Sequence, residues 1–201
     1  MSCETKKDKI LSASLKEFAD NGFDKASTDK ISRDAGVSKG LVFHYFKNKE
    51  NLYITTINMC IDDVFEAYEG FDYYDPDFCS ALTKLIELKY NFFVKNPLHY
   101  SLLVKSFYNS PKKLQKRLAV RYSEIKQIGI DIVVDMISHL PLKNDVDKED
   151  IVTVIMGITN VIEGRYLSYF IDNDSNFDKY YDLVKNDYIK LINIVMFGIL
   201  N

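Results

Sequence analysis

The chain has 201 residues, of which 47% are hydrophobic and 27% are charged, which is ordinary for a globular protein. Only four prolines and eight glycines favour long helices over many short strands, so we expect an all-α fold. No apolar run approaches the ~20 residues that a membrane-spanning helix needs, and the polar opening does not resemble a signal peptide. We therefore expect a cytoplasmic protein with no membrane partner.

The net charge of −3 is unevenly divided along the chain. Residues 1–50 carry ten Lys and Arg against eight Asp and Glu, whereas residues 51–201 carry sixteen against twenty-one. The N-terminal part is thus weakly basic. If it binds DNA, a local basic patch and two copies of the chain must supply the phosphate contacts.

Three cysteines, Cys3, Cys60 and Cys79, share no short spacing and belong to no Cys/His cluster. We expect thiols without a metal or disulfide role, and we predict no cofactor. Neither a nucleophile–base spacing nor a phosphate-binding glycine loop is present, so we predict that the chain is not an enzyme. A helical enzyme and a protein-interaction module remain the alternatives.

The first predicted helix spans residues 5–21. Its apolar residues recur at helical spacing on one face: Ile10, Leu11, Leu15, Phe18 and Ala19. Asn21 and Gly22 end it. This helix covers the back of the segment that follows.

Residues 28–46 have the pattern of a helix-turn-helix. Thr28 and Asp29 favour the start of the first helix. At the turn, Gly36 can adopt a left-handed conformation, Val37 can enter the core and Ser38 can cap the second helix.

The second helix, residues 39–46, leaves unusual side chains outside. With Val42, Phe46 and part of Tyr45 facing inward, the outward set is Lys39, Gly40, Leu41, Phe43 and His44. A cation, a bare glycine and apolar groups suit the major groove, where Lys binds guanine or phosphate and apolar atoms touch thymine methyl groups. Asn48 caps the next helix, and Lys47 and Lys49 add cations for a phosphate.

The run AGVSKGLVFHYFKNKENL, with Thr28 eight residues before Gly36 and with Phe18 and Gly22 ahead of it, resembles the TetR family of bacterial transcriptional regulators over residues 8–54. The chain departs from the commonest family pattern at two positions, with Leu41 in place of Thr and Phe43 in place of Tyr. We assign Leu41 an apolar base contact.

The resemblance implies a helix-turn-helix DNA-binding domain at 1–48, with its motif at 27–46, and a helical effector-binding and dimerisation domain at 49–201, about nine helices in all. It implies a ligand-responsive regulator, most often a repressor, that binds a palindromic operator in double-stranded DNA as a homodimer. Activation stays open.

The expected DNA-binding residues are Thr28, Ser38, Lys39, Gly40, Leu41, Phe43, His44, Tyr45 and Lys49. Of these, we expect Thr28, His44, Tyr45 and Lys49 to hold phosphates.

Six further helices are predicted, at about 48–69, 77–95, 97–109, 112–139, 148–172 and 177–200. The basic start of the 112–139 helix is typical of a solvated face rather than of a second DNA contact.

The last two helices are strongly apolar, and pairing them with their copies would form a four-helix bundle. Gly157 and Gly164 would allow close approach there. A monomeric core is the alternative.

Aromatic residues of the body are the candidates for a small-molecule effector site. The candidates are Tyr90, Phe93, Phe107, Tyr108, Tyr122, Tyr166 and Phe170, together with Glu163. A carboxylate in a long apolar helix must be paired, solvated or facing a ligand. Glu163 therefore forms a structural ion pair, for example with Arg165 of the partner subunit, or contacts the effector. The sequence predicts no metal site.

Overall fold

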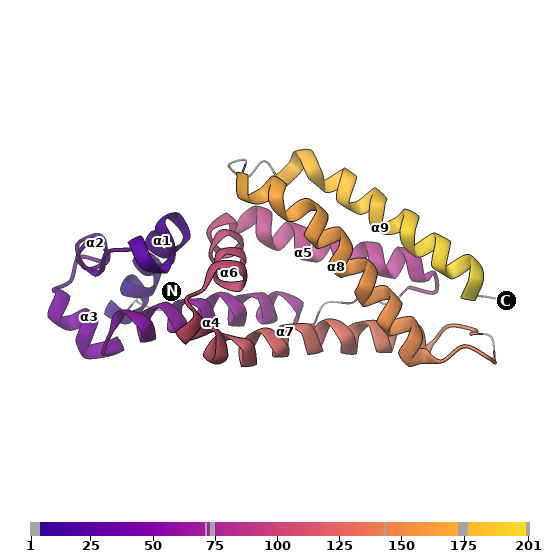
Figure 1. Cartoon of the computed structure of the whole chain (residues 1–201), viewed down its shortest axis with the longest axis horizontal. Coiled ribbons are helices and arrows are strands. Elements are labelled where there is room, and N and C mark those ends of the chain that lie inside the picture. The colour runs from indigo at the N-terminus through magenta and orange to yellow at the C-terminus, as the bar shows by residue number, and fades with distance from the viewer. Residues whose placement is uncertain (1–4, 71, 73–74, 143, 173–176, 200–201) are drawn as a thin grey trace. The chain divides into compact units, whose positions relative to one another are not determined.

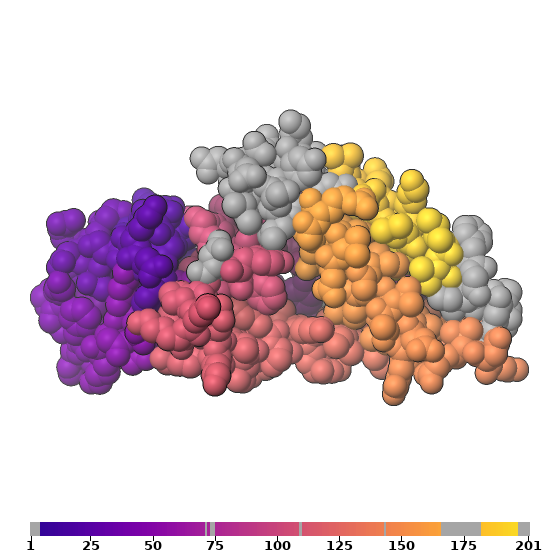
Figure 2. All heavy atoms as spheres, viewed as in Figure 1, coloured from indigo at the N-terminus to yellow at the C-terminus, as the bar shows by residue number. Residues whose placement is uncertain are grey.

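The computed structural model describes the backbone of residues 5–70, 72, 75–142, 144–172 and 177–199. Side chains are described for these residues except 109, 166–172, 177–181 and 197–199, and Figure 2 draws the undescribed side chains in grey. All elements in this part of the chain are α-helices, and none of them is long and apolar enough to cross a membrane.

Nine helices follow one another along the described chain (Figure 1). They are α1 (Lys6–Lys25), α2 (Thr28–Asp34), α3 (Lys39–Phe46), α4 (Lys49–Tyr68), α5 (Phe78–Lys95), α6 (Pro97–Asn109), α7 (Lys112–Ser138), α8 (Lys148–Asp172) and α9 (Phe177–Ile199). The all-α prediction and the helix number are confirmed. The chain divides into two compact units, one formed by residues 1–66 and 96–125 and the other by residues 67–95 and 126–201. The predicted domain boundary at residue 48 lies inside the first unit.

The first unit is built around the buried face of α1. Ile10 and Phe18 are fully buried, and the Tyr53 ring of α4 packs edge-on against Phe18, with the ring centroids 4.9 Å apart. On another side, α1 packs against α6, where the Ser101 hydroxyl donates to the carbonyl of Ala19 over 3.1 Å. The helix breaks at Gly22, as predicted, and one further turn continues to Lys25.

Basic residues at the start of α7 bind α4 within this unit. Lys113 pairs with Glu50, Arg117 donates to Asn51 over 3.1 Å, and Arg121 pairs with Asp62. Lys112, Lys113, Lys116 and Arg117 are exposed, as predicted for a solvated face, and Arg121 is half-buried. These contacts fix α4, the helix that follows α3, against α7.

The second unit has its core where α5, the end of α7, α8 and α9 meet. Its buried residues are Phe78, Ala81, Leu82, Val133, Met136, Ile137, Ile151, Val152, Ile155, Ile192 and Met196. Figure 1 shows α8 and α9 running side by side, and α9 also packs against α5. This arrangement uses only part of the apolar surface of the two last helices.

Apolar side chains remain on the outer faces of α8 and α9. Val161 is 57% exposed and Ile194 is 63% exposed, and Val154 and Leu183 are also exposed. A Cβ atom added to Gly157 or Gly164 would meet no other atom within 4 Å among the described residues. The exposed side of α8 thus combines the apolar side chains of Val154 and Val161 with two positions, Gly157 and Gly164, that carry no side chain.

Candidate DNA-binding site

Two serine caps delimit the helix-turn-helix. Ser38 caps α3 by accepting from the Leu41 N–H over 3.2 Å, and Gly36 has a φ of +65°, both as predicted. The cap of α2 is Ser27, which accepts from the Lys30 N–H over 3.3 Å. Thr28, expected to start the helix with its own side chain, is instead its first residue. Val37 is only half-buried.

Glu17 of α1 locks α2 in place, a role that the sequence analysis missed. Its side chain is 3% exposed, accepts from the Ser27 N–H over 2.9 Å and binds the Lys30 ammonium over 2.5 Å. Burial opposes ionisation, but these partners outweigh it and hold the pKa of Glu17 below its ordinary value. The available signal was an acidic residue directly beside Phe18 on the apolar face of α1.

α3 is anchored on one side and open on the other. Val42 and Phe46 are buried, whereas Lys39, Gly40, His44 and Tyr45 are exposed. Tyr45 thus lies further outside than predicted, at 43% exposure. The two other residues expected outside, Leu41 and Phe43, are half-buried. Figure 1 shows α3 at the end of its unit away from α6, so this open face is not covered by another element of the unit.

Lys39 and Gly40 lead the open face of α3. The Lys39 ammonium lies 2.9 Å from the Asp29 carboxylate, and both side chains are exposed. An exposed pair contributes only ~0–1 kcal/mol, so a phosphate or a base can replace Asp29 at small cost. A Cβ atom on Gly40 would lie no nearer than 3.9 Å to the Ser38 hydroxyl, its nearest neighbour, so the space in front of Gly40 is open. A DNA edge can approach the backbone there.

The turn from α3 to α4 is tight. Lys47 has a φ of 69°, and the Asn48 N–H donates to the Phe46 carbonyl over 2.8 Å. A non-glycine residue in this region is strained. Asn48 then caps α4, as predicted, by accepting from the Asn51 N–H over 2.8 Å.

Lys49, expected to hold a phosphate, lies against the end of α1. Its ammonium donates to the Asp24 carbonyl over 3.1 Å and lies 5.0 Å from the centroid of the Phe23 ring. Burial lowers its pKa. Its first role is therefore to hold α4 against α1, and a phosphate contact remains a prediction.

The candidate effector residues fall in both units. In the first unit, Phe107 packs edge-on against Tyr108 and Tyr122, with ring centroids 4.8 and 5.0 Å apart. Phe107 and Tyr108 are more than half exposed, whereas the Tyr122 hydroxyl donates to the Leu103 carbonyl over 3.2 Å and burial raises its pKa. In the second unit, Tyr90 and Phe93 are half-buried on α5.

Glu163 pairs with Lys89 of α5 in the same subunit. Arg165 binds Asp187 of the same subunit over 2.5 Å, and a pair between Glu163 and Arg165 of the partner subunit stays a prediction. The side chains of Tyr166 and Phe170 lie outside the described set.

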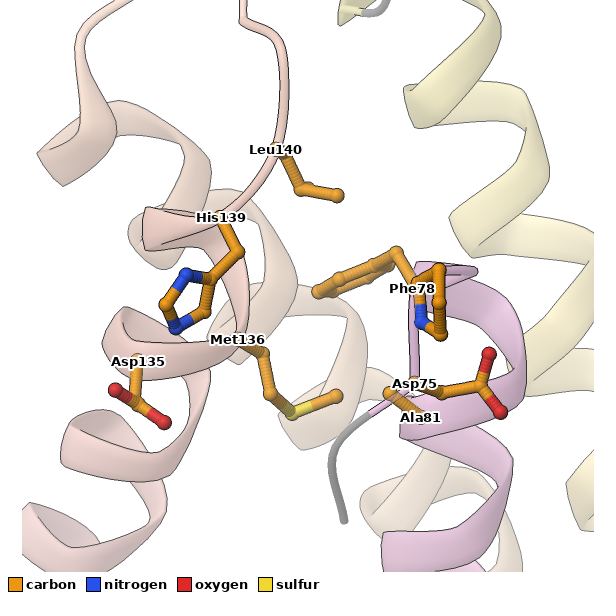
Figure 3. Close-up of a pocket in the computed structure, with 8 residues that line it drawn as sticks. Asp75, Phe78, Ala81, Asp135, Met136, His139 and Leu140 are labelled. Carbon is orange, nitrogen blue, oxygen red and sulfur yellow. The ribbon is translucent and has the colours of Figure 1, made fainter.

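A small pocket of about 150 Å³ lies in the second unit (Figure 3). The Phe78 ring of α5 and Met136 of α7 extend into the space between these helices, and Asp135 and His139 lie on α7. None of the candidate effector residues lines it. Among the described residues, no cluster of His, Cys, Asp and Glu is arranged to hold a metal ion.

Residues 10–55 match the family model described as bacterial regulatory proteins, tetR family. The biofilm operon negative transcriptional regulator IcaR of Staphylococcus epidermidis is 23% identical over 150 residues, which are 75% of this chain and 78% of that protein. RutR of Escherichia coli is 42% identical over 86 residues, which are 42% of this chain and 39% of that protein.

Solved structures share the fold along most of the chain. A TetR-like transcriptional regulator from Rhodococcus sp. RHA1 has a TM-score of 0.62 at 17% identity, over 94% of this chain and 96% of that chain. The fatty acid degradation regulator FadR of Bacillus halodurans has a TM-score of 0.60 at 16% identity, over 94% and 97%. The helix-turn-helix thus lies within the residues that match the tetR family model, and the fold as a whole is similar to that of TetR-like transcriptional regulators.

Proposed function

We propose that this regulator is a homodimeric repressor that inserts α3 of each subunit into the major groove of one operator half-site. The observation that carries this assignment is the two-sided environment of α3. Val42 and Phe46 fix its inner face, while Lys39, Gly40 and Tyr45 stand on a face that no other element of the unit covers. Lys39, Gly40 and Leu41 would face bases. Phosphate contacts fall to Thr28, His44, Tyr45 and Lys49, while Ser38 and Phe43 flank them.

The second subunit would pack through α8 and α9. The exposed Val154, Val161, Leu183 and Ile194 form an apolar surface of the kind that a subunit contact buries, and the open strip at Gly157 and Gly164 permits close helix packing. A twofold dimer presents two α3 helices to half-sites about one helical turn (~34 Å) or a little more apart.

A small, largely apolar or aromatic effector would relieve repression by favouring a state of the dimer in which the two α3 helices are wrongly spaced. DNA affinity would then fall by the coupling free energy between the two sites. The names of two relatives include both directions of control: the negative regulator IcaR and the transcriptional activator FasR of Mycolicibacterium smegmatis. We assign repression because a change in the spacing of the two α3 helices directly explains how an effector would release the protein from DNA.

The test is fluorescence anisotropy with a labelled duplex from the region upstream of the protein's own gene and a scrambled duplex as control. We expect tighter binding to the first duplex by ~10³-fold or more, with two protomers bound. The double variant Lys39→Ala/Tyr45→Phe should weaken this binding at least ~10-fold, because it removes one base contact and one phosphate contact per half-site.

Lys126→Ala is the matched control, since Lys126 is an exposed lysine of α7 outside the helix-turn-helix. It should leave DNA affinity unchanged. Unaltered binding by a folded Lys39→Ala/Tyr45→Phe variant would contradict the assigned contacts. If the upstream duplex is not preferred, selection of bound genomic fragments decides whether the protein reads another sequence.

A further inference from the structure

An ion pair inside the second unit joins α5 to α8. The Lys89 ammonium donates to the Glu163 carboxylate, and the two side chains remain 47% and 45% exposed. Lys89 also interacts electrostatically with Tyr188 of α9 and with Tyr68 at the end of α4. Groups from four helices therefore meet around one lysine.

The surroundings of this pair are apolar. Ile162, next to Glu163, is fully buried, and it shares a cluster with Tyr188, which is 7% exposed. Among the described residues, the partly buried hydrophobic side chains packed against that cluster are Ile86, Ile158, Val184 and Leu191. A ligand group at Lys89 would thus lie beside aliphatic surface.

The solvent exposure of the pair and the burial of its neighbours describe its environment. Water still reaches almost half of each side chain. Burial opposes the charge of Lys89, but the interactions with Glu163, Tyr188 and Tyr68 outweigh it and raise the pKa of Lys89. Desolvation also raises the pKa of Tyr68, and that of Tyr188 to about 12. The pair is therefore half-exposed, whereas its neighbour Tyr188 is buried.

Lys89 has hydrogen-bond donors left over among the described residues. It has three N–H groups and donates one of them to the Glu163 carboxylate. The nearest other charges along α8 and α5 are already paired, Arg165 with Asp187 over 2.5 Å and Glu87 with Lys185 over 2.6 Å. The remaining N–H groups of Lys89 can donate to an added anionic group.

We propose that Lys89 binds the carboxylate of an effector with an aliphatic body, and that Glu163 holds the place of that carboxylate in the free protein. This assignment rests on the proposed function, because it names the chemical class of the ligand to which the regulator responds. Replacement of one carboxylate by another leaves the charge at Lys89 balanced. It also releases the link between α5 and α8, so binding changes the contacts of these helices.

The test is isothermal titration calorimetry of the full-length protein, without DNA, against decanoate, decanol and decylamine. We expect binding of decanoate in preference to the two other probes. Glu163→Gln should tighten decanoate binding several-fold, because it removes the competing carboxylate. Lys89→Met should weaken it roughly 10-fold or more, because it removes the charged donor and keeps the length of the side chain.

Lys185→Met is the matched control, since it breaks a comparable ion pair between α9 and α5 and should leave decanoate affinity unchanged. Circular dichroism establishes that each variant is folded. If Lys89→Met does not fold, Glu163→Gln decides alone. Equal affinity for decanoate and decanol, preference for decylamine, or no gain in Glu163→Gln would overturn the assignment.

The anisotropy measurement on the operator separates this inference from the proposed function. DNA binding without any binding of decanoate overturns the carboxylate site only. Binding of decanoate by a protein that does not bind DNA overturns the repressor assignment and leaves the site standing.

Discussion

Glu17 shows how a single residue sets the geometry of the DNA-binding part. Its carboxylate holds both the first free N–H before α2 and the Lys30 side chain within α2, so α2 cannot rotate against α1 without breaking both bonds. Because α3 follows α2 after only a short turn, the orientation of α2 against α1 also sets the direction of the open face of α3. A buried carboxylate in a small core is tolerated here because its partners come from the element that it orients.

Replacing Glu17 by Gln should make the protein less stable by about 1 kcal/mol at pH 7, because Gln can still accept from Ser27 but cannot attract the Lys30 charge. Exposure of Lys30 limits the effect through solvent screening. Glu17→Ala also removes the acceptor for the Ser27 N–H and should cost more, about 2 kcal/mol. Urea unfolding measures both changes.

The same contact predicts a pH dependence. The pKa of Glu17 is depressed in the folded protein, so its stabilising contribution is complete above its ordinary value of 4.5 and is lost as the pH falls through the lower folded value. Unfolding free energies of wild type and Glu17→Gln should converge as the pH is lowered through that range. A constant difference across it would show that the charge of Glu17 contributes nothing.

At the scale of the elements, α8 and α9 have two apolar faces each. One face builds the core with α5 and α7, through residues such as Ile155 and Ile192. The other carries Val161 and Ile194 in water. An isolated subunit would therefore keep an apolar strip exposed, which a second copy would cover.

If the proposed dimer forms through α8 and α9, Val161→Glu/Ile194→Glu should convert it into a monomer, because two buried carboxylates per subunit without partners would oppose association. Sedimentation equilibrium measures the mass, and the helical circular dichroism signal should be retained. Val134→Glu is the control, since Val134 is an exposed valine of α7 in the same unit. Dissociation by Val134→Glu as well, or a dimer that survives the double change, would place the interface elsewhere.

At the scale of the whole molecule, the distribution of charge matters more than its sum. A protein with a net charge of −3 can bind DNA only through a local concentration of cations, and residues 1–50 carry an excess of just two. Two copies on one operator double the phosphate contacts without changing the chain. In the proposed dimer, dimerisation and operator affinity would therefore be coupled.

Operator affinity should fall steeply with salt. If each subunit neutralises about three or four phosphates, the slope of log K against log [NaCl] should be about −5 to −7 for the dimer. The Val161→Glu/Ile194→Glu variant should show roughly half this slope. Anisotropy titrations at several NaCl concentrations measure it, and equal slopes for the two proteins would mean that one subunit makes all the phosphate contacts.

Local features of this protein could be predicted from its sequence. Helix positions follow from apolar residues at helical spacing, and the turn of the helix-turn-helix follows from Gly36 and Ser38, because these signals act within a few residues. Such signals did not distinguish Ser27, the observed cap of α2, from Thr28, the predicted one, because neighbouring hydroxyl residues are similarly good caps. The outward side of α3 was predicted correctly for Lys39, Gly40 and His44.

The sequence alone thus determined the helices and the helix-turn-helix, both of which depend on short-range patterns. Only the tertiary structure decided that Glu17 orients α2, that Lys113 and Arg121 bind α4, and that Glu163 pairs with Lys89. The last two residues are 74 positions apart. A charge or a hydroxyl has many candidate partners in the sequence, and the folded chain selects one of them through distance and burial, which no local pattern encodes.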